Sequence, residues 1–573
     1  MPVQNSEIAD AFEKMADLLE IEGANAFRVR AYREAARTVH GYPRSMADLL
    51  QHGDALTELP GIGKDLAAKI KTLVDTGRLP ALEKVESRTP AALSDLMRIP
   101  GLGPERVKAL YKKLGIASAD DLKRAVDSGK VRELEGFGEK TEQMIRDRLE
   151  HFSIKQARSK LAVAEDIAEP LVAYLKKSDG VKDIVVAGSY RRCQETVGDL
   201  DIVVTASKNT PVIGHFTRYG QVAEVVSQGQ TRSTVRLRSG MQVDLRVVPE
   251  ASYGAALHYF TGSKAHNIAV RKLGVKKGYK INEYGVFNGN ERIAGKTEAE
   301  IYEKVGLPFI PPELRENRGE IEAARKNRLP NLITLEDIRG DLHCHTKESD
   351  GRNTLREMAE AAAQRGYEYI SINDHSRHVT IAHGLDSKRL LAQVGEIDKL
   401  NEKLGGIVVL KSIELDILKD GTLDLPDSVL KELDFTVCAV HYAFNLPREE
   451  QNERILRAMD NPYFNILAHP SGRLINQREP YQFDIETIME AALERGCFLE
   501  VNAQPARLDL TDEACKLARD MGLKVALSTD AHSDNGLGLM RFGIKQARRG
   551  WLERGDVINC LPLHELKKLF NRK

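Results

Sequence analysis

The sequence predicts a multidomain protein with an α-helical N-terminal region, an α+β middle domain and a C-terminal α/β domain of the barrel type. Three observations carry this prediction. They are three copies of a Gly-x-Gly turn followed by helical periodicity, a strand–turn–strand series with spaced aspartates, and a strand–helix alternation repeated about seven times. With 573 residues and 42% apolar content, the chain is long enough to form several separate cores.

The N-terminal third predicts helices joined by hairpin turns. Apolar residues recur at helical spacing over residues 6–52, and the similar phrases LPGIGKDLAAKI, IPGLGPERVKAL and LEGFGEKTEQMI follow. Glycine permits each tight turn, and the new helix offers free N–H groups that can hold a DNA phosphate without reading bases. A plain helical corner is the alternative for any single copy. The predicted DNA-contacting glycines are Gly61, Gly63, Gly101, Gly103, Gly136 and Gly138.

The stretch IVVAGSYRRCQETVGDLDIVV, residues 184–204, predicts a buried strand, a turn into a helix and a second strand. Ser189 then lies at a helix N-terminus, where free N–H groups and the helix dipole favour a phosphate, with Arg191 or Arg192 adding charge. Asp199 and Asp201 are two residues apart on the returning strand, so both carboxylates share one face.

A third acid follows in TRSTVRLRSGMQVDLRVVP, which predicts two alternating strands joined at Ser239-Gly240 and places Asp244 in the second. Three carboxylates beside a phosphate-binding turn predict a site for two divalent cations, Mg²⁺ or Mn²⁺. The alternative for the Asp-x-Asp pair alone is a solvated strand end without a role.

The motifs GSYRR, GDLDIVV, VDLRVVP, YFTGSKAHN and INEYG occur in that order and resemble the palm of family X DNA polymerases, the group that includes DNA polymerase beta. The resemblance spans most of residues 1–310. It implies a nucleotidyltransferase palm in which Asp199, Asp201 and Asp244 are catalytic and carry the metals. The implied nucleotide-binding residues, with the aromatic pair against the sugar and the last two facing the base pair or template, are Gly188, Ser189, Arg192, Gly198, Tyr259, Phe260, Gly262, Asn267 and Arg271.

The first two hairpins also resemble the helix–hairpin–helix elements of family X enzymes, and the third extends beyond the animal polymerase pattern. Lys69 aligns with a lysine that forms a Schiff base with deoxyribose phosphate in some relatives, which implies lyase activity. Here Asp65 stands nearby where those relatives have another lysine. A surface lysine that contacts phosphate is the alternative.

Charge is unevenly distributed along the chain, although 84 basic and 84 acidic residues balance overall. Residues 151–330 hold 28 basic and 20 acidic residues, whereas residues 331–573 hold 32 and 39. A basic middle fits a nucleic-acid partner, and a solvated basic face is the alternative. The densest cluster comprises Arg271, Lys272, Lys276, Lys277 and Lys280.

The C-terminal third follows a proline-containing connector. It places metal-type side chains at the ends of its predicted strands, where βα barrels build active sites, and His343 and His345 are predicted on one face of the first strand. A single buried histidine is usually a satisfied core residue. Nine imidazoles and carboxylates are too many to bury without cations, and mixed nitrogen and oxygen donors suit zinc, manganese or iron. The nine predicted ligands are His343, His345, Asp350, His375, Glu414, His441, His469, Asp530 and His532.

The phrases HCH, NDH, SIELD, AVH, AHP and TDAH resemble the PHP domain, a phosphoesterase of polymerases and histidinol phosphatases, over about residues 338–570. The resemblance implies an α/β PHP barrel, a distorted βα barrel of about seven strands, with up to three divalent metals (Mn²⁺, Zn²⁺ or Fe²⁺). Four neighbouring residues either contact substrate, support the metal ligands or are ordinary loop residues: His378, His383, Arg473 and Glu500.

These readings predict five segments. They are a helical domain with the first hairpin (1–85), a fingers-like helical domain (86–155), the palm and nucleotide-binding subdomain (156–310), a linker (311–337) and the PHP domain (338–573).

The combination resembles the bacterial PolX family, in which a family X polymerase is fused to a PHP nuclease. It implies a DNA repair enzyme, acting in base excision repair, that fills short gaps by templated addition and has 3′-5′ exonuclease and abasic-site endonuclease activity. Its partners would be gapped or primer–template DNA and deoxynucleoside triphosphates. The alternatives are a template-independent nucleotidyltransferase, a DNA-binding scaffold carrying only a PHP phosphoesterase, and a polymerase whose PHP domain is structural.

Apolar runs, the N-terminal pattern and the cysteine spacing bear on the compartment of the protein. No run of about eighteen apolar residues predicts a membrane span, and the N-terminus lacks the pattern of a signal peptide. The six cysteines have neither paired nor zinc-finger spacing, which suits reduced thiols. We therefore expect a cytoplasmic protein, and a monomer is the default in the absence of any sequence signal for assembly.

Overall fold

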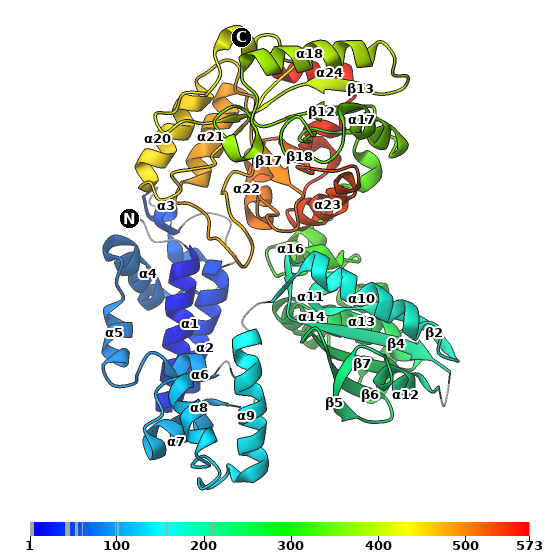
Figure 1. The fold of residues 1–573 in the computed structure, drawn as a ribbon. Coiled ribbons are helices and arrows are strands. Elements are labelled where there is room, and N and C mark those ends of the chain that lie inside the picture. Colours follow the sequence, from blue (N-terminus) through cyan, green and yellow to red (C-terminus); the bar gives the residue numbers. More distant parts are fainter. Residues whose placement is uncertain are drawn as a thin grey trace. The chain divides into compact units, whose positions relative to one another are not determined.

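The computed structural model describes residues 5–40, 46–51, 55–59, 61–97, 99, 102–155, 158–207 and 210–571. The chain divides into two compact units, Met1–Ala157 and Arg158–Lys573 (Figure 1). Among the described helices, none combines the length and apolarity that a membrane crossing requires.

The first unit is helical, as the apolar spacing predicts. Phe12 and Tyr32 are buried in its core and meet edge to face with ring centroids 5.6 Å apart. Leu66 and Ile70, one helical turn apart, add to the same core. Its helices are α1 (Asn5–Glu22), α2 (Ala26–His40), α3 (Met46–Gln51), α4 (Lys64–Thr76), α5 (Pro80–Glu86), α6 (Leu93–Met97), α7 (Pro104–Leu114), α8 (Ala119–Asp127) and α9 (Gly138–Lys155).

The second unit begins with a five-stranded sheet of order β2-β4-β7-β6-β5 (Figure 1). β4 and β7 run parallel, and Asp201 stands opposite Asp244. Because side chains alternate, Leu200 and Ile202 face a core shared with α10 (Leu161–Leu175) and α12 (Val212–Thr217), while α13 (Tyr253–Thr261) packs on the other face. The strands are β2 (Val181–Val186), β4 (Asp199–Ala206), β5 (Val222–Gln228), β6 (Arg232–Leu237) and β7 (Gln242–Val248).

A smaller α+β subdomain follows the sheet. Its antiparallel strands have the order β10-β9-β8 and pack with α14 and α15 around the buried Tyr302. Its elements are α14 (Lys264–Lys276), β8 (Tyr279–Asn282), β9 (Gly285–Asn288), β10 (Glu291–Ala294) and α15 (Glu298–Val305).

The C-terminal part is a parallel βα barrel, as predicted. Only Ser412 and Ile413 separate β13 from β14, so these two segments form one bent strand and the barrel has seven strands. A bridge between Cys344 and Ala531 links the segments that directly follow its first and last strands. The strands are β11 (Gly340–Asp341), β12 (Tyr369–Ile372), β13 (Val408–Lys411), β14 (Glu414–Asp416), β15 (Val437–Ala439), β16 (Ile466–Leu467), β17 (Phe498–Asn502) and β18 (Val525–Ser528).

Helices surround this barrel (Figure 1). Their buried faces share one core with the strands, including Met358, Ile397, Ile455 and Ile488. The helices are α17 (Leu355–Gln364), α18 (Ser387–Asn401), α19 (Asp427–Leu430), α20 (Arg448–Met459), α21 (Ile485–Arg495), α22 (Asp512–Met521), α23 (Met540–Arg549) and α24 (Leu563–Phe570).

The first barrel strand is shorter than the sequence predicts. We expect His343 and His345 on β11, but that strand ends at Asp341 and the two histidines follow it. Side-chain oxygens replace the regular ladder there, since the Cys344 N–H donates to Asn373 Oδ1 at 3.2 Å. The two imidazoles nevertheless turn to the same side, because His345 Nε2 lies 3.2 Å from His343 Nε2.

The barrel packs firmly on the five-stranded sheet domain within the second unit. Leu508 and Phe542 of the barrel are buried in the same cluster as the sheet residues Val243 and Leu245. The predicted linker also packs on the barrel: Ala324 of α16 (Glu320–Arg325) is buried in one cluster with Trp551, and Arg318 just before the helix pairs with Asp512.

Arg549 of the barrel forms buried ion pairs and a hydrogen bond that reach the sheet domain of the same unit. Its guanidinium donates to Glu316 at 3.1 Å, to Asp512 at 2.6 Å and to the Arg192 carbonyl at 2.7 Å, and its side chain is 3% exposed. We expect Arg549→Ala to lower the free energy of unfolding by about 3 kcal/mol, because it leaves buried carboxylates without their partner. Urea denaturation measures this loss. The exposed Arg554→Ala is the control, and equal midpoints for the two variants would contradict the prediction.

Candidate functional site

The three palm carboxylates lie on adjacent parallel strands. The register places Asp201 opposite Asp244, with Asp199 at the start of β4. Asp244 is held by Thr234 Oγ1 at 2.5 Å and by Gln242 Nε2 at 2.9 Å. The structure thus brings the predicted acids to one end of the sheet. These three aspartates are not among the groups of described residues whose possible metal-ligand atoms all lie within 4.8 Å of one another.

Crowded negative charge marks this site. Burial, together with the carboxylates of Asp199 and Asp244, raises the pKa of Asp201 to about 7. Gly188 comes close to the same group, since a Cβ there would lie 2.9 Å from Asp201 Oδ2, and its φ is +63°. Such crowding is the environment that divalent cations relieve, so the residues present fit a metal site.

The loop beside the acids holds the predicted phosphate-binding residues. Ser189 lies in α11 (Gly188–Arg191), and Gly198 directly precedes Asp199. Arg192 is engaged by the protein itself, because its guanidinium donates to Glu316 at 2.8 Å and to the Thr261 carbonyl at 2.5 Å. A triphosphate would therefore compete with Glu316 for Arg192.

The predicted sugar and base contacts cluster on α13 and α14. Tyr259 is 38% exposed and meets Phe260 edge to face, with centroids 5.1 Å apart. Asn267 Nδ2 donates to the Tyr259 carbonyl at 2.7 Å, and Arg271 is exposed one turn further along α14. Gly262 ends α13 with a φ of +69°. The end of α13 lies beside the nucleotide loop, because Arg192 donates to the Thr261 carbonyl.

The hairpin glycines adopt the expected turn geometry. Gly61 and Gly136 have φ values of +77° and +85°, a region that favours glycine. Gly63 and Gly103 directly precede α4 and α7, and no atom lies within 4 Å of a Cβ built at either. A phosphate could approach both helix starts, and Gly138, which begins α9, is equally open. Gly101 lies outside the described residues.

Lys69 is engaged by an acid one helical turn away. Its Nζ pairs with Asp65 and lies 5.9 Å from the centre of the Tyr32 ring. A Schiff base needs a free amine, so this ion pair would have to open first. The lyase role of Lys69 stays a prediction.

In the barrel, the structure brings all nine predicted ligands together. Their donor atoms form three overlapping groups, each within 4.8 Å, and two residues, His345 and His375, belong to two groups each. The groups are His345, Asp350, His375 and His532; His343, His345 and Asp530; and His375, Glu414 and His441. His469 joins through Glu414, whose Oε1 lies 3.0 Å from His469 Nε2.

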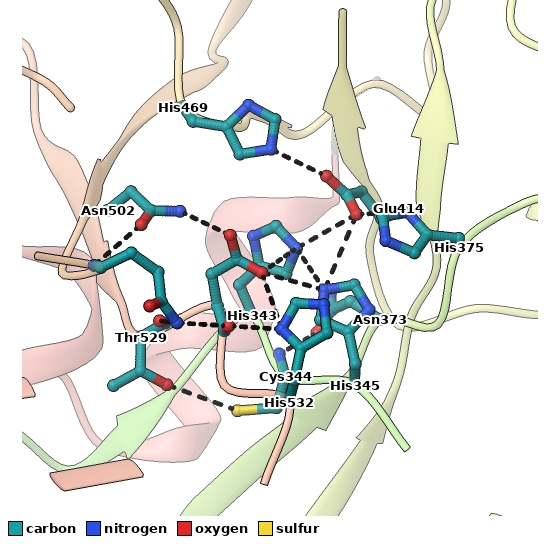
Figure 2. A network of polar contacts seen from close by, with 12 residues as sticks. His343, Cys344, His345, Asn373, His375, Glu414, His469, Asn502, Thr529 and His532 are labelled. Carbon is teal, nitrogen blue, oxygen red and sulfur yellow. Dashed lines mark hydrogen bonds and ion pairs between the residues drawn. The ribbon is translucent and has the colours of Figure 1, made fainter. Parts of the chain in front are cut away.

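Glu414 lies at the centre of the cluster (Figure 2). Its Oε2 is 2.8 Å from His375 Nδ1 and 3.5 Å from His343 Nε2, and its Oε1 is 3.2 Å from His441 Nε2. Asp530 Oδ1 lies 3.1 Å from His345 Nε2. Every described imidazole of the cluster therefore has a carboxylate within 4 Å.

The electrostatics of the cluster suit cations. Burial by itself raises the pKa of Glu414, but His375, His441 and His343 outweigh it and hold that pKa well below its usual range. Among the described residues, buried atoms without a hydrogen-bond partner include His345 Nδ1 and His469 Nδ1. A buried polar atom without a hydrogen-bond partner costs free energy, and coordination to a bound cation would offset that cost. The residues present therefore fit a multinuclear metal site.

Two ligands of the cluster have uncommon backbone conformations. His469 and Asp530 have positive φ values of 27° and 50°, which are uncommon for residues with side chains. Such strain persists where the surrounding structure holds a residue for function.

Two supporting acids orient the ligands. Glu500, which the sequence marked as a neighbour, is fully buried on β17 and lies 2.8 Å from His343 Nδ1. Asp416, which sequence reasoning missed, lies 3.2 Å from His441 Nδ1. Carboxylates in this position fix the tautomer and orientation of metal-binding histidines. The sequence does contain a signal for Asp416: it lies two residues after Glu414, so both side chains point to the same face of the strand.

Family models match four parts of the chain. They are a helix–hairpin–helix domain (3–79), a SAM-like helix–hairpin–helix tandem (93–150), a DNA polymerase beta thumb (256–316) and a PHP domain (341–504).

Curated relatives match the chain wholly or in part. The "DNA polymerase/3′-5′ exonuclease PolX" of Bacillus subtilis is 37% identical over 574 residues, covering 100% of both chains. A probable phosphatase of Thermoanaerobacter sp. is 31% identical over 231 residues, which cover 38% of this chain and 89% of that protein. DNA polymerase lambda of Arabidopsis thaliana is 26% identical over 349 residues, covering 55% of this chain and 62% of that protein. The full-length match, together with the polymerase and PHP models, shows that the chain belongs to the PolX family, in which a family X DNA polymerase is joined to a PHP domain.

Proposed function

We propose that the chain is a DNA repair polymerase that fills short gaps by template-directed addition and removes nucleotides from 3′ ends through its PHP domain. One observation carries the proposal: a single chain combines three crowded palm acids with a nine-ligand imidazole and carboxylate cluster. The full-length similarity to a relative named as a polymerase and 3′-5′ exonuclease supports it. Abasic-site incision, the monomeric state and the cytoplasmic location stay predictions.

In the polymerase reaction, Asp199, Asp201 and Asp244 would hold Mg²⁺ or Mn²⁺. The cations would activate the attacking 3′ oxygen and stabilise the leaving pyrophosphate. The chain's own residues position the partners: Tyr259 and Phe260 would lie against the sugar of the incoming nucleotide. The open helix starts of the hairpins would hold DNA phosphates without regard to sequence.

In the nuclease reaction, the nine cluster residues would hold up to three cations, Mn²⁺, Zn²⁺ or Fe²⁺. The cations would supply the Lewis acidity that phosphodiester hydrolysis requires. Glu500 and Asp416 would fix the imidazoles of His343 and His441 in the orientation that presents one ring nitrogen to the site. We further propose the domain boundaries predicted above as the working division of the chain.

Template dependence separates this proposal from its nearest rival. On a one-nucleotide gap opposite thymine, we expect dATP to be added on the order of 100-fold faster than each other nucleotide. We expect no addition when the template strand is omitted. Primer extension with each nucleotide separately measures both. Equal use of all four, or extension of the single strand, would instead support a template-independent transferase, and addition of any kind excludes an inert scaffold.

A further inference from the structure

The nucleotide loop, residues 188–198, connects the two parts of the palm site. It begins at the short helix that carries Ser189 and ends at Gly198, directly before Asp199 on β4. A shift of this loop would therefore move the phosphate-binding groups relative to the metal-binding acids. Phosphoryl transfer depends on the alignment of phosphate and cations, so the conformation of the loop matters for the polymerase reaction.

The loop is irregular between α11 and β4. Cys193 has a positive φ of 55°, and the short strand β3 (Thr196–Val197) pairs with Ser159 and Lys160 alone. A residue with a side chain keeps such a φ only where the surrounding structure holds it. The conformation of the loop therefore depends on contacts with other segments of the chain.

Two arginines of the barrel make such contacts. Arg473 donates through Nη2 to Glu195 Oε2 at 2.6 Å and through Nη1 to Glu195 Oε1 at 3.3 Å. Arg549 donates to the Arg192 carbonyl at 2.7 Å. A two-pronged pair between a guanidinium and a carboxylate fixes orientation as well as distance. The barrel thus holds the loop between its phosphate-binding start and its metal-binding end.

The barrel in turn fixes the position of Arg473. The Nε of Arg473 donates to the Arg507 carbonyl at 2.9 Å, and its Nη2 also donates to the Leu508 carbonyl at 2.6 Å. Only 11% of the Arg473 side chain is exposed, and Leu508 is buried in one cluster with Val243 of the palm sheet. Because both sides of the contact are packed, little conformational freedom is lost when the loop binds a ligand.

We propose that Arg473 of the barrel is a positioning residue of the polymerase reaction, because its pair with Glu195 holds the nucleotide loop in the conformation that binds the incoming triphosphate. The inference rests on the proposed polymerase function and assigns part of its machinery to the barrel. Arg473 and Glu195 belong neither to the three palm acids nor to the nine predicted barrel ligands. The two metal sites therefore stay chemically independent.

Nucleotide binding without catalysis tests the proposal. Gapped DNA with a dideoxy-terminated primer forms a complex with dATP and Mg²⁺ that cannot react. We expect Arg473→Ala and Glu195→Gln each to raise the dissociation constant of dATP roughly 10-fold, because the loop loses charge-assisted hydrogen bonds that fix it. Glu195→Gln changes only the charge of a side chain that is 31% exposed, so it keeps the test valid if Arg473→Ala folds poorly.

Arg339→Ala is the control for these variants. Arg339 is a half-buried barrel arginine whose carboxylate partner, Glu368, also belongs to the barrel. We expect this variant to bind dATP like the unmodified protein. All variants should bind the gapped DNA itself with unchanged affinity, because the loop positions the nucleotide and the hairpins hold the DNA.

The double variant Glu195→Gln/Arg473→Ala separates a pair from two unrelated effects. If the two residues act together, the double variant should bind dATP no more weakly than the weaker single variant. Independent effects would multiply to roughly 100-fold and would contradict the proposal. Arg473→Lys should recover part of the loss, because it keeps the positive charge but not the planar fork.

Gap-filling kinetics give the second readout. We expect KM for dATP to rise in both single variants with a smaller change in kcat, and shortening of 3′ ends to be unchanged in Glu195→Gln. If the protein fills gaps but both variants bind dATP like Arg339→Ala, the positioning role is wrong and the polymerase function stands. If the unmodified protein adds no nucleotide but binds dATP in an Arg473-dependent way, the positioning of the loop stands and the proposed function fails.

Discussion

Asp201→Ala is expected to lower gap filling by roughly 1,000-fold, about 4 kcal/mol of activation free energy. Asp201 stands opposite Asp244 on the neighbouring strand, so the substitution removes one of the three carboxylates that would hold the cations. Single-turnover primer extension with Mg²⁺ measures the loss.

The matched control for this variant is Asp183→Ala, which removes an exposed acid from the adjacent strand β2. It should extend primers at the rate of the unmodified protein. Shortening of 3′ ends should be unchanged in both variants, because the barrel has its own ligands. Full nucleotide addition by Asp201→Ala would remove this residue from the polymerase site.

His343→Ala is expected to lower hydrolysis of 3′ ends by a similar factor, roughly 1,000-fold. His343 is fully buried between Glu500 and the remaining ligands, with His345 at 3.2 Å. Burial lowers the pKa of His343, but the carboxylates of Glu500 and Glu414 reverse that effect and raise it well above its usual value. Removing the imidazole would take one partner from each of these carboxylates and reduce metal binding.

His564→Ala is the control for this variant, since His564 is exposed outside the cluster. Metal content, measured by elemental analysis of the purified proteins, should fall in His343→Ala and stay constant in His564→Ala. Hydrolysis at the normal rate by His343→Ala, in a preparation free of other nucleases, would show that the cluster is not the nuclease site.

Much of this architecture follows from local sequence patterns. Strand alternation correctly predicts that Leu200 is buried while Asp201 faces the opposite side. Most of the barrel ligands are predictable because they lie at or just after the end of an apolar strand, and parallel strands bring their ends together, whereas Asp350 lies in a loop. Asp65 could also have been predicted as the partner of Lys69, since the two residues are four apart on one helix.

The remaining features depend on contacts between distant segments. Glu195 and Arg473 are 278 residues apart, and only the packing of the barrel on the sheet domain brings them together. Arg549 and Arg192 are also far apart in the chain and meet only in the folded protein. The early end of β11 likewise depends on Asn373, whose side chain replaces a strand partner. Such side-chain substitutions for backbone pairing are invisible to periodicity.

The account's central claim is that one chain holds two independent active sites. The most direct test uses a primer paired across a one-nucleotide gap, with Mn²⁺ and nucleotides present or absent, and compares the unmodified protein with Asp201→Ala and His343→Ala. We predict that primer lengthening is lost only in Asp201→Ala and shortening only in His343→Ala. Loss of both activities in either variant, with folding and DNA binding intact, would contradict two independent sites.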